Sequence, residues 1–167
     1  SKFEIEQKID AYFQQGAEFL SLRFFNVYGP EQRLDSNYGA VVPIFIDRYT
    51  QGIQPTIYGS GKQSRDFVNV RDVSRLLVDL SIGEWAQPKQ SVYNVGTGQS
   101  VTITELASLI HELSQSNLAF EPSFQTQRAG DIEHSVASIE AIRRDFNWKP
   151  EISLENGLRE LIEVDSS

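Results

Sequence analysis

Two arginines in loop-like segments have the side chain best suited to bind an anion. Arg65 precedes Asp66 and an apolar segment, and Arg128 precedes Ala129-Gly130-Asp131. A guanidinium group binds phosphate oxygens in pairs, and a neighbouring glycine lets the chain approach a diphosphate closely. Each arginine could equally form a surface ion pair with the aspartate beside it, and the spacing leaves both interpretations open.

Two glycine-rich turns have only part of a nucleotide-binding pattern. In GSGK (59–62), Thr56 stands where a phosphate loop has its first glycine, and Gln63 replaces the Ser or Thr that would hold magnesium. In GTGQSV (96–101), Val101 stands where a dinucleotide loop has its third glycine. Neither turn is therefore predicted to cradle a nucleotide phosphate.

The residues that bind metals or act as general bases are sparse. The chain has no cysteine and two isolated histidines, His111 in an amphipathic segment and His134 in a polar one. No Ser-His-Asp order or metal-ligand spacing accompanies them. We therefore expect both histidines to be surface or core-edge residues and predict no metal site.

Composition narrows the class of partner. The chain has 167 residues and a formal net charge of −8, which argues against a general nucleic-acid or anionic-membrane surface. An anionic ligand would therefore be held by a few local arginines. No apolar run approaches the roughly 20 residues of a membrane span, and the absence of cysteine fits a cytoplasmic protein.

Helical and strand-like segments alternate along the chain, which favours an α/β architecture. Residues 19–27 (FLSLRFFNV) form an apolar run without period-two alternation, which predicts a strand buried on both faces, as in a parallel sheet. A further strand is predicted at 91–95. Polar residues up to about Gly39 predict a loop. The other predicted strands cover 55–59, 66–70 and 118–124, and the predicted helices cover 1–15, 42–49, 69–82, 103–113, 139–146 and the segment after Ser153.

The first segment, SKFEIEQKI, allows two interpretations. Ile5, Ile9 and Tyr12 lie on one face of a helix, and Ser1 with Glu4 has the spacing of a capping box. The helix could begin at this cap, or it could be the rear of a longer helix.

Five stretches, in this order, resemble the extended short-chain dehydrogenase/reductase family, and within it the NAD-dependent nucleotide-sugar epimerases and dehydratases of the UDP-glucose 4-epimerase type. They are LRFFNVYGP (22–30), GSGKQSRDFVNVRDV (59–73), VYNVGTG (92–98), RAGD (128–131) and WKPEISLENGL (148–158). The resemblance implies an α/β fold: the C-terminal part of a Rossmann-type parallel sheet, in which the strands at 19–27 and 91–95 are neighbours, plus a smaller α/β substrate-binding domain. Residues 1–30 and 69–114 would contribute to the Rossmann part and 31–68 and 115–167 to the substrate-binding part, with the N-terminal NAD-binding half absent.

The same resemblance implies a binding site for a nucleoside-diphosphate sugar, with a UDP-sugar favoured. Asn26 matches the asparagine that contacts the substrate near its diphosphate, Arg65 and Arg128 match the arginines that clamp the diphosphate, and Asp131 matches the carboxylate that reaches the ribose. The family usually has proline at the position of Ala129. That difference removes loop stiffness but no hydrogen-bond donor.

On the cofactor side, the resemblance places Phe24 and Phe25 along the nicotinamide and makes Lys2 the lysine of a Tyr-x-x-x-Lys pair. Because the tyrosine and the lysine are four residues apart on a helix, the lysine ammonium can lower the pKa of the tyrosine phenol and hold the cofactor ribose. The tyrosine would stand three residues before Ser1, so Lys2 favours the longer-helix interpretation of the first segment.

The implied reaction is NAD-dependent 4-epimerisation of a UDP-hexose through a 4-keto intermediate. A 4,6-dehydratase, which eliminates water from that intermediate, is the alternative. A non-catalytic sugar-nucleotide-binding fragment is a third hypothesis, because the tyrosine and the glycine-rich cofactor loop fall outside the sequence and the chain alone is expected to be inactive. An uncovered strand edge and helix face further predict a homodimer or association with the missing segment.

Overall fold

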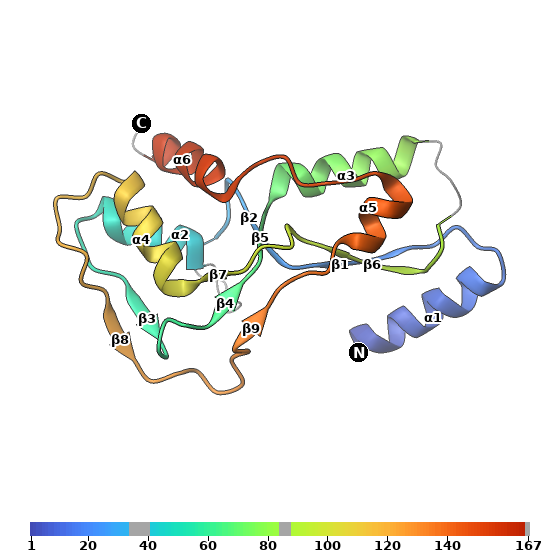
Figure 1. Ribbon diagram of the computed structural model, residues 1–167, viewed down its shortest axis with the longest axis horizontal. Coiled ribbons are helices and arrows are strands. Elements are labelled where there is room, and N and C mark those ends of the chain that lie inside the picture. The colour runs from blue at the N-terminus through green and yellow to red at the C-terminus, as the bar shows by residue number, and fades with distance from the viewer. Residues whose placement is uncertain (34–40, 84–87, 166–167) are drawn as a thin grey trace.

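One part of the molecule is built on a pair of parallel strands. The computed structural model describes residues 1–33, 41–83 and 88–165, and in it β1 (Ser21–Phe24) pairs in parallel with β6 (Val92–Val95). Helices α3 (Val70–Ile82) and α5 (Glu140–Phe146) lie on one side of this pair and α1 (Lys2–Gln14) on the other (Figure 1). The predicted parallel pairing of these two segments is confirmed.

The prediction of a single strand over 19–27, buried on both faces, was wrong. The strand breaks at Phe25: β1 ends there, and β2 (Asn26–Tyr28) pairs in parallel with β5 (Phe67–Asn69) instead of β6. Phe24 is 46% exposed, because the helix beside β1 buries none of its own residues and covers the strand incompletely. The break directs β1 and β2 into different parts of the molecule.

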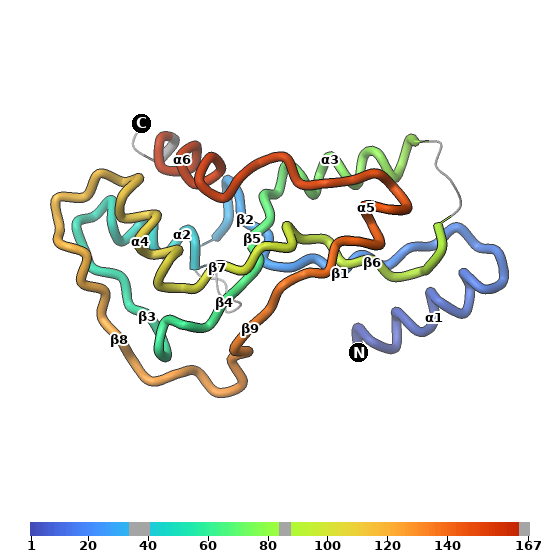
Figure 2. Tube along the Cα trace, in the orientation of Figure 1, coloured from blue at the N-terminus to red at the C-terminus, as the bar shows by residue number. Residues whose placement is uncertain are grey.

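Three helices form the second part of the molecule: α2 (Val41–Thr50), α4 (Ile103–Leu113) and α6 (Leu154–Asp165). They enclose one hydrophobic core, while a second core lies between α3, α5 and β6. Figure 2 shows the chain passing repeatedly between the two parts. The division into a Rossmann part and a substrate-binding part remains a prediction. It assigns α4 to the Rossmann part and α5 to the substrate-binding part, whereas α4 packs in the first core and α5 in the second.

Short strands connect the two parts. Strand β3 (Thr56–Tyr58) pairs in parallel with β8 (Ser123–Gln125), so the strand predicted over 118–124 begins later than expected. Strand β4 (Ser64–Arg65) pairs antiparallel with β7 (Val101–Thr102) and parallel with β9 (His134–Ser135). The segment directly after the GSGK turn (59–62) therefore forms a strand, because β4 gains partners that are distant in sequence.

Side-chain caps occur at helix starts predicted from the sequence and also at Ser1, where the rear of a longer helix was the favoured interpretation. Ser1 with Glu4 and Thr102 with Glu105 both form complete capping boxes. Asn69 caps α3, and the Ser153 hydroxyl accepts a hydrogen bond from the Asn156 amide at the start of α6. The predicted loop up to Gly39 lies partly outside the described residues.

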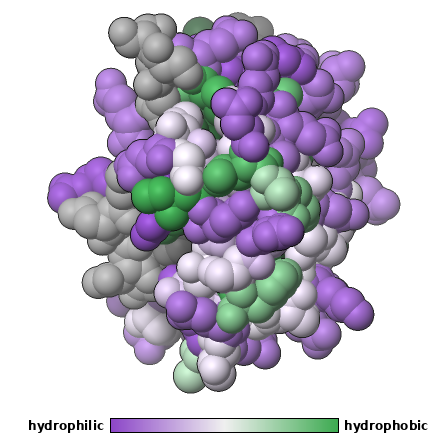
Figure 3. Space-filling model, turned by 90° about the vertical axis from the view of Figure 1, so that its left-hand side faces the viewer, coloured by the Kyte–Doolittle hydropathy of each residue, from purple (hydrophilic) through white to green (hydrophobic). Residues whose placement is uncertain are grey.

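The outer surface at the end formed by α2, α4, β3 and β8 is largely hydrophilic. In Figure 3, green apolar residues form separate patches among purple hydrophilic ones. No helix within residues 1–33, 41–83 and 88–165 is long and apolar enough to cross a membrane. In the same ranges, no cluster of three or more His, Asp or Glu side chains could hold a metal ion.

Candidate functional site

A cavity of about 490 Å³ brings together residues from distant parts of the sequence. Asn26 at the start of β2, Arg65 in β4, and Arg128 and Asp131 in the loop after β8 all line it. These are the four side chains assigned to the substrate by the family resemblance. Lys2, Phe24 and Phe25 are not among the residues that line this cavity.

Helix α2 supplies the apolar wall of the cavity. Val41, Ile44, Phe45 and Arg48 recur at three- and four-residue steps, so they share one helix face, and all four line the cavity. Ile57 from β3 extends the apolar surface. Arg48 was not predicted as a site residue from the sequence, although its position on the same helix face as Val41, Ile44 and Phe45 is a signal that could have identified it.

Arg65 is held by two oxygens inside the cavity wall. Its Nη2 donates a 2.5 Å hydrogen bond to Asp131 Oδ1, and its Nη1 donates a 2.8 Å bond to the Ser64 carbonyl oxygen. The side chains of Arg65 and Asp131 are 15% and 24% exposed, so this ion pair is largely shielded from water. The sequence left open a pair with the neighbouring Asp66, but the structure pairs Arg65 with Asp131.

Arg128 has a different environment on the same cavity. Its guanidinium carbon lies 4.2 Å from the centroid of the Tyr58 ring, a cation–π contact. Among the described residues Arg128 forms no ion pair of 4 Å or less, and its side chain is exposed. Of these two arginines, Arg65 is therefore neutralised by a carboxylate, whereas the charge of Arg128 is available to an anion.

Asn26 lies where β1 gives way to β2. Its backbone amide and its Nδ2 both donate to the Asp66 carbonyl oxygen, at 3.0 Å and 3.2 Å. Its Oδ1 accepts no hydrogen bond from the described residues. The side-chain amide is thus fixed in orientation and keeps an acceptor for a ligand.

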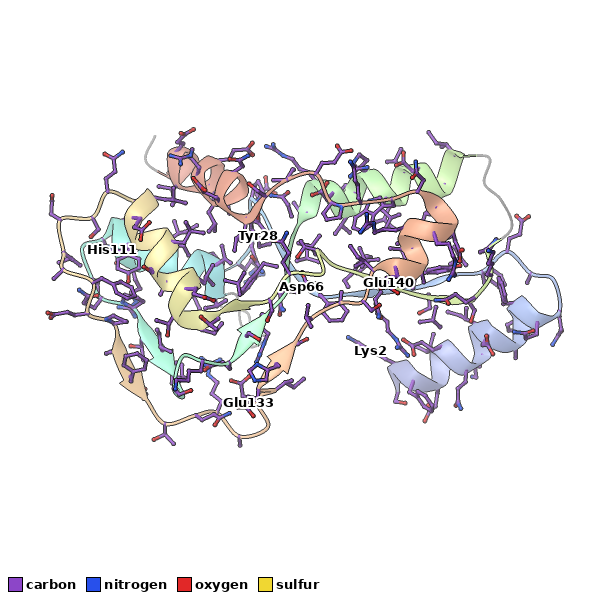
Figure 4. All side chains as sticks on the ribbon, in the orientation of Figure 1. Lys2, Tyr28, Asp66, His111, Glu133 and Glu140 are labelled. Carbon is purple, nitrogen blue, oxygen red and sulfur yellow. The ribbon has the colours of Figure 1, made fainter. Side chains whose placement is uncertain are left out.

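Asp66 supports the site from behind. Its carboxylate is fully buried and accepts hydrogen bonds from the Thr97 amide (2.8 Å), the Thr97 hydroxyl (2.6 Å), the Gly98 amide (2.9 Å) and the Ala137 amide (3.1 Å). The GTG turn at 96–98 therefore binds a carboxylate of the chain itself, which agrees with its failure to match a dinucleotide loop. Figure 4 shows Asp66 near the middle of the molecule, between its two parts.

The turn containing GSGK docks on a helix. The Gly61 carbonyl oxygen accepts hydrogen bonds from the Thr104 amide (3.1 Å) and hydroxyl (3.2 Å) at the start of α4. A Cβ on Gly61 would lie 2.1 Å from that hydroxyl oxygen. This close approach explains why residue 61 is a glycine. The turn packs against α4 of the protein itself, which agrees with its mismatch to the phosphate-loop pattern.

The histidines have structural partners. His134 Nδ1 lies 3.0 Å from the Ser64 hydroxyl, which also accepts a 2.7 Å hydrogen bond from the Ser100 hydroxyl. His111 Nε2 lies 2.8 Å from the Leu118 carbonyl oxygen. The His134 contact joins segments that are 70 positions apart, whereas the His111 contact ties α4 to the loop that follows it, and neither histidine lines the cavity.

Lys2 lies toward the carboxyl ends of β1 and β6. Arg23 in β1 donates two hydrogen bonds to Glu6, and Ser91, just before β6, donates one to Asp10. Helix α1 therefore runs antiparallel to β1, and Lys2, one turn before Glu6, shares its face and lies beyond Arg23. Figure 4 shows Lys2 at the start of α1. Ligands of open α/β sheets bind outside this carboxyl edge.

Comparison with known proteins identifies the family. The model of the NAD-dependent epimerase/dehydratase family matches residues 1–96. UDP-glucuronic acid decarboxylase 1 of Xenopus tropicalis is 36% identical over 149 residues, which are 89% of this chain and 34% of that protein. The dTDP-L-rhamnose 4-epimerase of Burkholderia thailandensis is 32% identical over 141 residues, which are 84% of this chain and 38% of that protein.

A solved structure gives the same result for the fold. The UDP-glucose 4-epimerase of Thermotoga maritima, crystallised with UDP-glucose, superimposes with a TM-score of 0.86 at 32% identity and covers 99% of this chain and 52% of that one. Across the curated relatives named here and others, this chain spans between 34% and 50% of their length. The fold is a partial Rossmann-like α/β fragment, and the chain belongs to the NAD-dependent epimerase/dehydratase family.

Proposed function

We propose that this chain binds a UDP-hexose in the cavity and supplies the substrate-binding half of an NAD-dependent 4-epimerase. The observation that carries the proposal is the convergence of Asn26, Arg65, Arg128 and Asp131 on one cavity of about 490 Å³. That volume falls within the roughly 300–1,000 Å³ typical of small-molecule sites. Apolar walls with a few fixed polar groups are also typical of such sites.

The distribution of charge suggests how the ligand lies. Arg65 and Arg128 would hold the diphosphate, because guanidinium groups match phosphate oxygens in pairs. Asp131 would accept hydrogen bonds from the ribose, with the base against the apolar face of α2. The hexose would then extend past Asn26 toward the carboxyl ends of β1 and β6, the end at which Lys2 lies.

The residues assigned to NAD fit a dinucleotide in their chemistry. Lys2 is exposed and forms no ion pair or hydrogen bond with residues of the described ranges, so its ammonium is available to ribose hydroxyls. Phe24 presents a ring that is 46% exposed. When bound, NAD supplies the acceptor and donor of hydride. In this proposal Lys2 holds the cofactor ribose and lowers the pKa of a tyrosine one helical turn before it.

Two alternatives share this binding site. A 4,6-dehydratase would use the same 4-keto intermediate and eliminate water from it. A binding module without turnover would hold the sugar nucleotide through the same arginines. Product analysis with a chain that includes the tyrosine position separates the three: a C4 epimer supports the epimerase, a 4-keto-6-deoxy sugar the dehydratase, and binding without product the module.

The binding proposal is tested by calorimetric titration of UDP-glucose, dTDP-glucose and GDP-mannose into the wild type, Arg65→Ala and Arg128→Ala. Loss of a charge-assisted phosphate contact should cost about 1.5–3 kcal/mol, or roughly 10- to 150-fold in Kd. Arg159→Ala is the matched control, because Arg159 pairs with Glu155 on the outer face of α6. If both cavity variants bind the preferred ligand as tightly as the control does, the clamp assignment is wrong.

A further inference from the structure

Arg65 and Arg128, two of the three arginines that line the cavity, differ in how accessible their charge is to an incoming anion. Arg65 already donates to the Asp131 carboxylate at 2.5 Å and to the Ser64 carbonyl oxygen at 2.8 Å. Arg128 rests on the Tyr58 ring and pairs with no carboxylate among the described residues. An anion can therefore bind Arg128 directly, whereas at Arg65 it meets a carboxylate already in place.

Displacing Asp131 from Arg65 carries a cost that depends on the ligand. A carboxylate accepts hydrogen bonds but donates none, so once released from Arg65 it needs a donor. At 24% exposure, water reaches the Asp131 side chain only in part. A partly buried charge that loses its partner is strongly disfavoured unless another group replaces that partner.

From this ion pair we infer that Asp131 is an internal competitor for Arg65 and thereby selects ligands that combine a diphosphate with neighbouring hydroxyl groups. A simple anion such as pyrophosphate takes Arg65 and leaves the carboxylate without a donor. A nucleoside diphosphate offers its ribose hydroxyls to the released carboxylate and compensates for the loss. This inference rests on the proposed function and adds to it the physical basis of substrate selection.

The charges of the cavity predict the direction of a substitution. Its described lining includes three arginines (Arg48, Arg65, Arg128) and two aspartates (Asp47, Asp131), a balance of +1. Asp131→Asn raises the balance to +2 and frees Arg65. Asp47→Asn makes the same change in charge, but Asp47 accepts a hydrogen bond from Gln51, the residue after α2, and pairs with no arginine among the described residues. It is therefore the matched control for charge alone.

The test measures the binding of three probes by calorimetry: inorganic pyrophosphate, UDP, and 2′,3′-dideoxy-UDP, which lacks the vicinal hydroxyls. In the wild type, removing the hydroxyls should weaken UDP binding about tenfold, as loss of hydrogen bonds to a charged group does. In Asp131→Asn, pyrophosphate should bind about tenfold more tightly, and the difference between UDP and its dideoxy analogue should shrink, because a neutral amide oxygen accepts weaker hydrogen bonds than a carboxylate does. In Asp47→Asn, all three affinities should change by one common factor.

Several results would show that Asp131 does not compete with the ligand for Arg65. Unchanged or weaker pyrophosphate binding in Asp131→Asn overturns the inference, as does equal binding of UDP and dideoxy-UDP to the wild type, a readout that needs no variant. The gain in pyrophosphate affinity should disappear in Arg65→Ala/Asp131→Asn, and its persistence there also counts against a competition for Arg65.

Failure of UDP to bind the wild type refutes the proposed function, whereas a gain in pyrophosphate affinity in Asp131→Asn still supports competition between Asp131 and the ligand for Arg65. Absence of binding by every probe refutes both.

Discussion

The buried carboxylate of Asp66 accepts two hydrogen bonds from Thr97, one from its amide at 2.8 Å and one from its hydroxyl at 2.6 Å. Asp66 follows Arg65 in the chain, and its carbonyl oxygen holds the amide and side chain of Asn26. One residue therefore fixes two of the proposed ligand-binding side chains to the turn after β6. The site depends on this buried carboxylate even though the carboxylate does not line the cavity.

Asp66→Asn is expected to destabilise the protein severely. The amide group of asparagine would direct donors toward the backbone and hydroxyl donors that Asp66 now satisfies, and each unsatisfied buried group costs about 1–3 kcal/mol. We expect the free energy of unfolding in urea to fall by more than about 2 kcal/mol. Asp79→Asn, an exposed change on α3, should stay within about 0.5 kcal/mol of wild type. Equal stability of the two variants would show that the GTG turn does not depend on Asp66.

The pair formed by Tyr93 and Asp145 predicts how stability varies with pH. Asp145 accepts hydrogen bonds from Arg144 and from the Tyr93 hydroxyl (2.7 Å), and these hold the pKa of Asp145 well below its usual range. A carboxylate with a lowered pKa stabilises the fold above its unfolded-state pKa of about 4, and this contribution is lost as the pH falls toward the folded-state value. Burial, with the hydrogen bond to Asp145, raises the pKa of Tyr93 to about 12.

Asp145→Asn should therefore lower the free energy of unfolding by about 1–3 kcal/mol at neutral pH, and the deficit should shrink below about pH 4. The contribution of Tyr93 should persist below about pH 10 and be lost as the pH rises toward 12. Urea unfolding between pH 3 and pH 8 checks the acidic limb. Glu121→Gln, an exposed carboxylate change, is the control. A deficit that stays constant down to pH 3 would contradict the assignment.

Gly157 in α6 is required by close packing against Tyr28. A Cβ at position 157 would lie 2.2 Å from the Tyr28 hydroxyl oxygen and 2.7 Å from Asn69 Nδ2. Burial raises the pKa of Tyr28 to about 12, and its hydroxyl oxygen is enclosed by the protein. The hydroxyl therefore occupies the space that a larger residue at 157 would need.

Gly157→Ala should destabilise the protein by about 1–3 kcal/mol through overpacking, although alanine is the better helix former by about 1 kcal/mol. Removing the Tyr28 hydroxyl should relieve part of the overpacking. The double variant Tyr28→Phe/Gly157→Ala should therefore be more stable than the sum of the two single changes predicts. Asn156→Ala, exposed on the same turn, should be neutral or slightly stabilising. Strict additivity in thermal or urea unfolding would exclude the proposed clash.

The sequence carried enough information for the locally determined features. Helix starts with capping residues, such as Thr102 with Glu105, depend on local pattern and were predicted from it. The parallel pairing of 21–24 with 92–95 was predicted from the family resemblance. The break at Phe25 was not, because an apolar run does not reveal that its two halves pair with different strands. The two-residue strands β4, β7 and β9 also escaped prediction, since they exist only through distant pairing.

The candidate site likewise combines residues that the sequence identifies with contacts that only the tertiary structure reveals. Motif resemblance selected four of the residues that line the cavity, but the partner of Arg65 depends on tertiary structure. The neighbouring Asp66 is occupied by backbone donors, so Arg65 pairs with Asp131, 66 positions away. The contact of Arg128 with Tyr58 likewise brings together residues from two strand regions that only the fold places side by side.

Helix α1 is attached to the strands mainly by polar contacts, which makes it sensitive to single changes. It buries no residue, and the paired hydrogen bonds from Arg23 to Glu6 (2.8 and 2.7 Å) hold its second turn. Arg23→Ala should increase amide hydrogen exchange in residues 2–14 about two- to fivefold, with little change in β6. Arg143→Ala, an exposed change on α5, is the control. Unchanged exchange in α1 would mean that this ion pair does not position Lys2.

Exposed apolar side chains on α3 predict self-association or pairing with a complementary segment of a longer chain. Val78 is 54% exposed and Ile82 is 80% exposed, one helical turn apart on the same face. Burying apolar surface contributes roughly 25 cal/mol per Å², so this face favours a partner. Val78→Lys/Ile82→Lys should reduce the mass measured by light scattering at a given concentration. Ser74→Lys, on an exposed polar position of the same helix, should leave it unchanged. A wild-type protein that stays monomeric at all concentrations would show that α3 needs no partner.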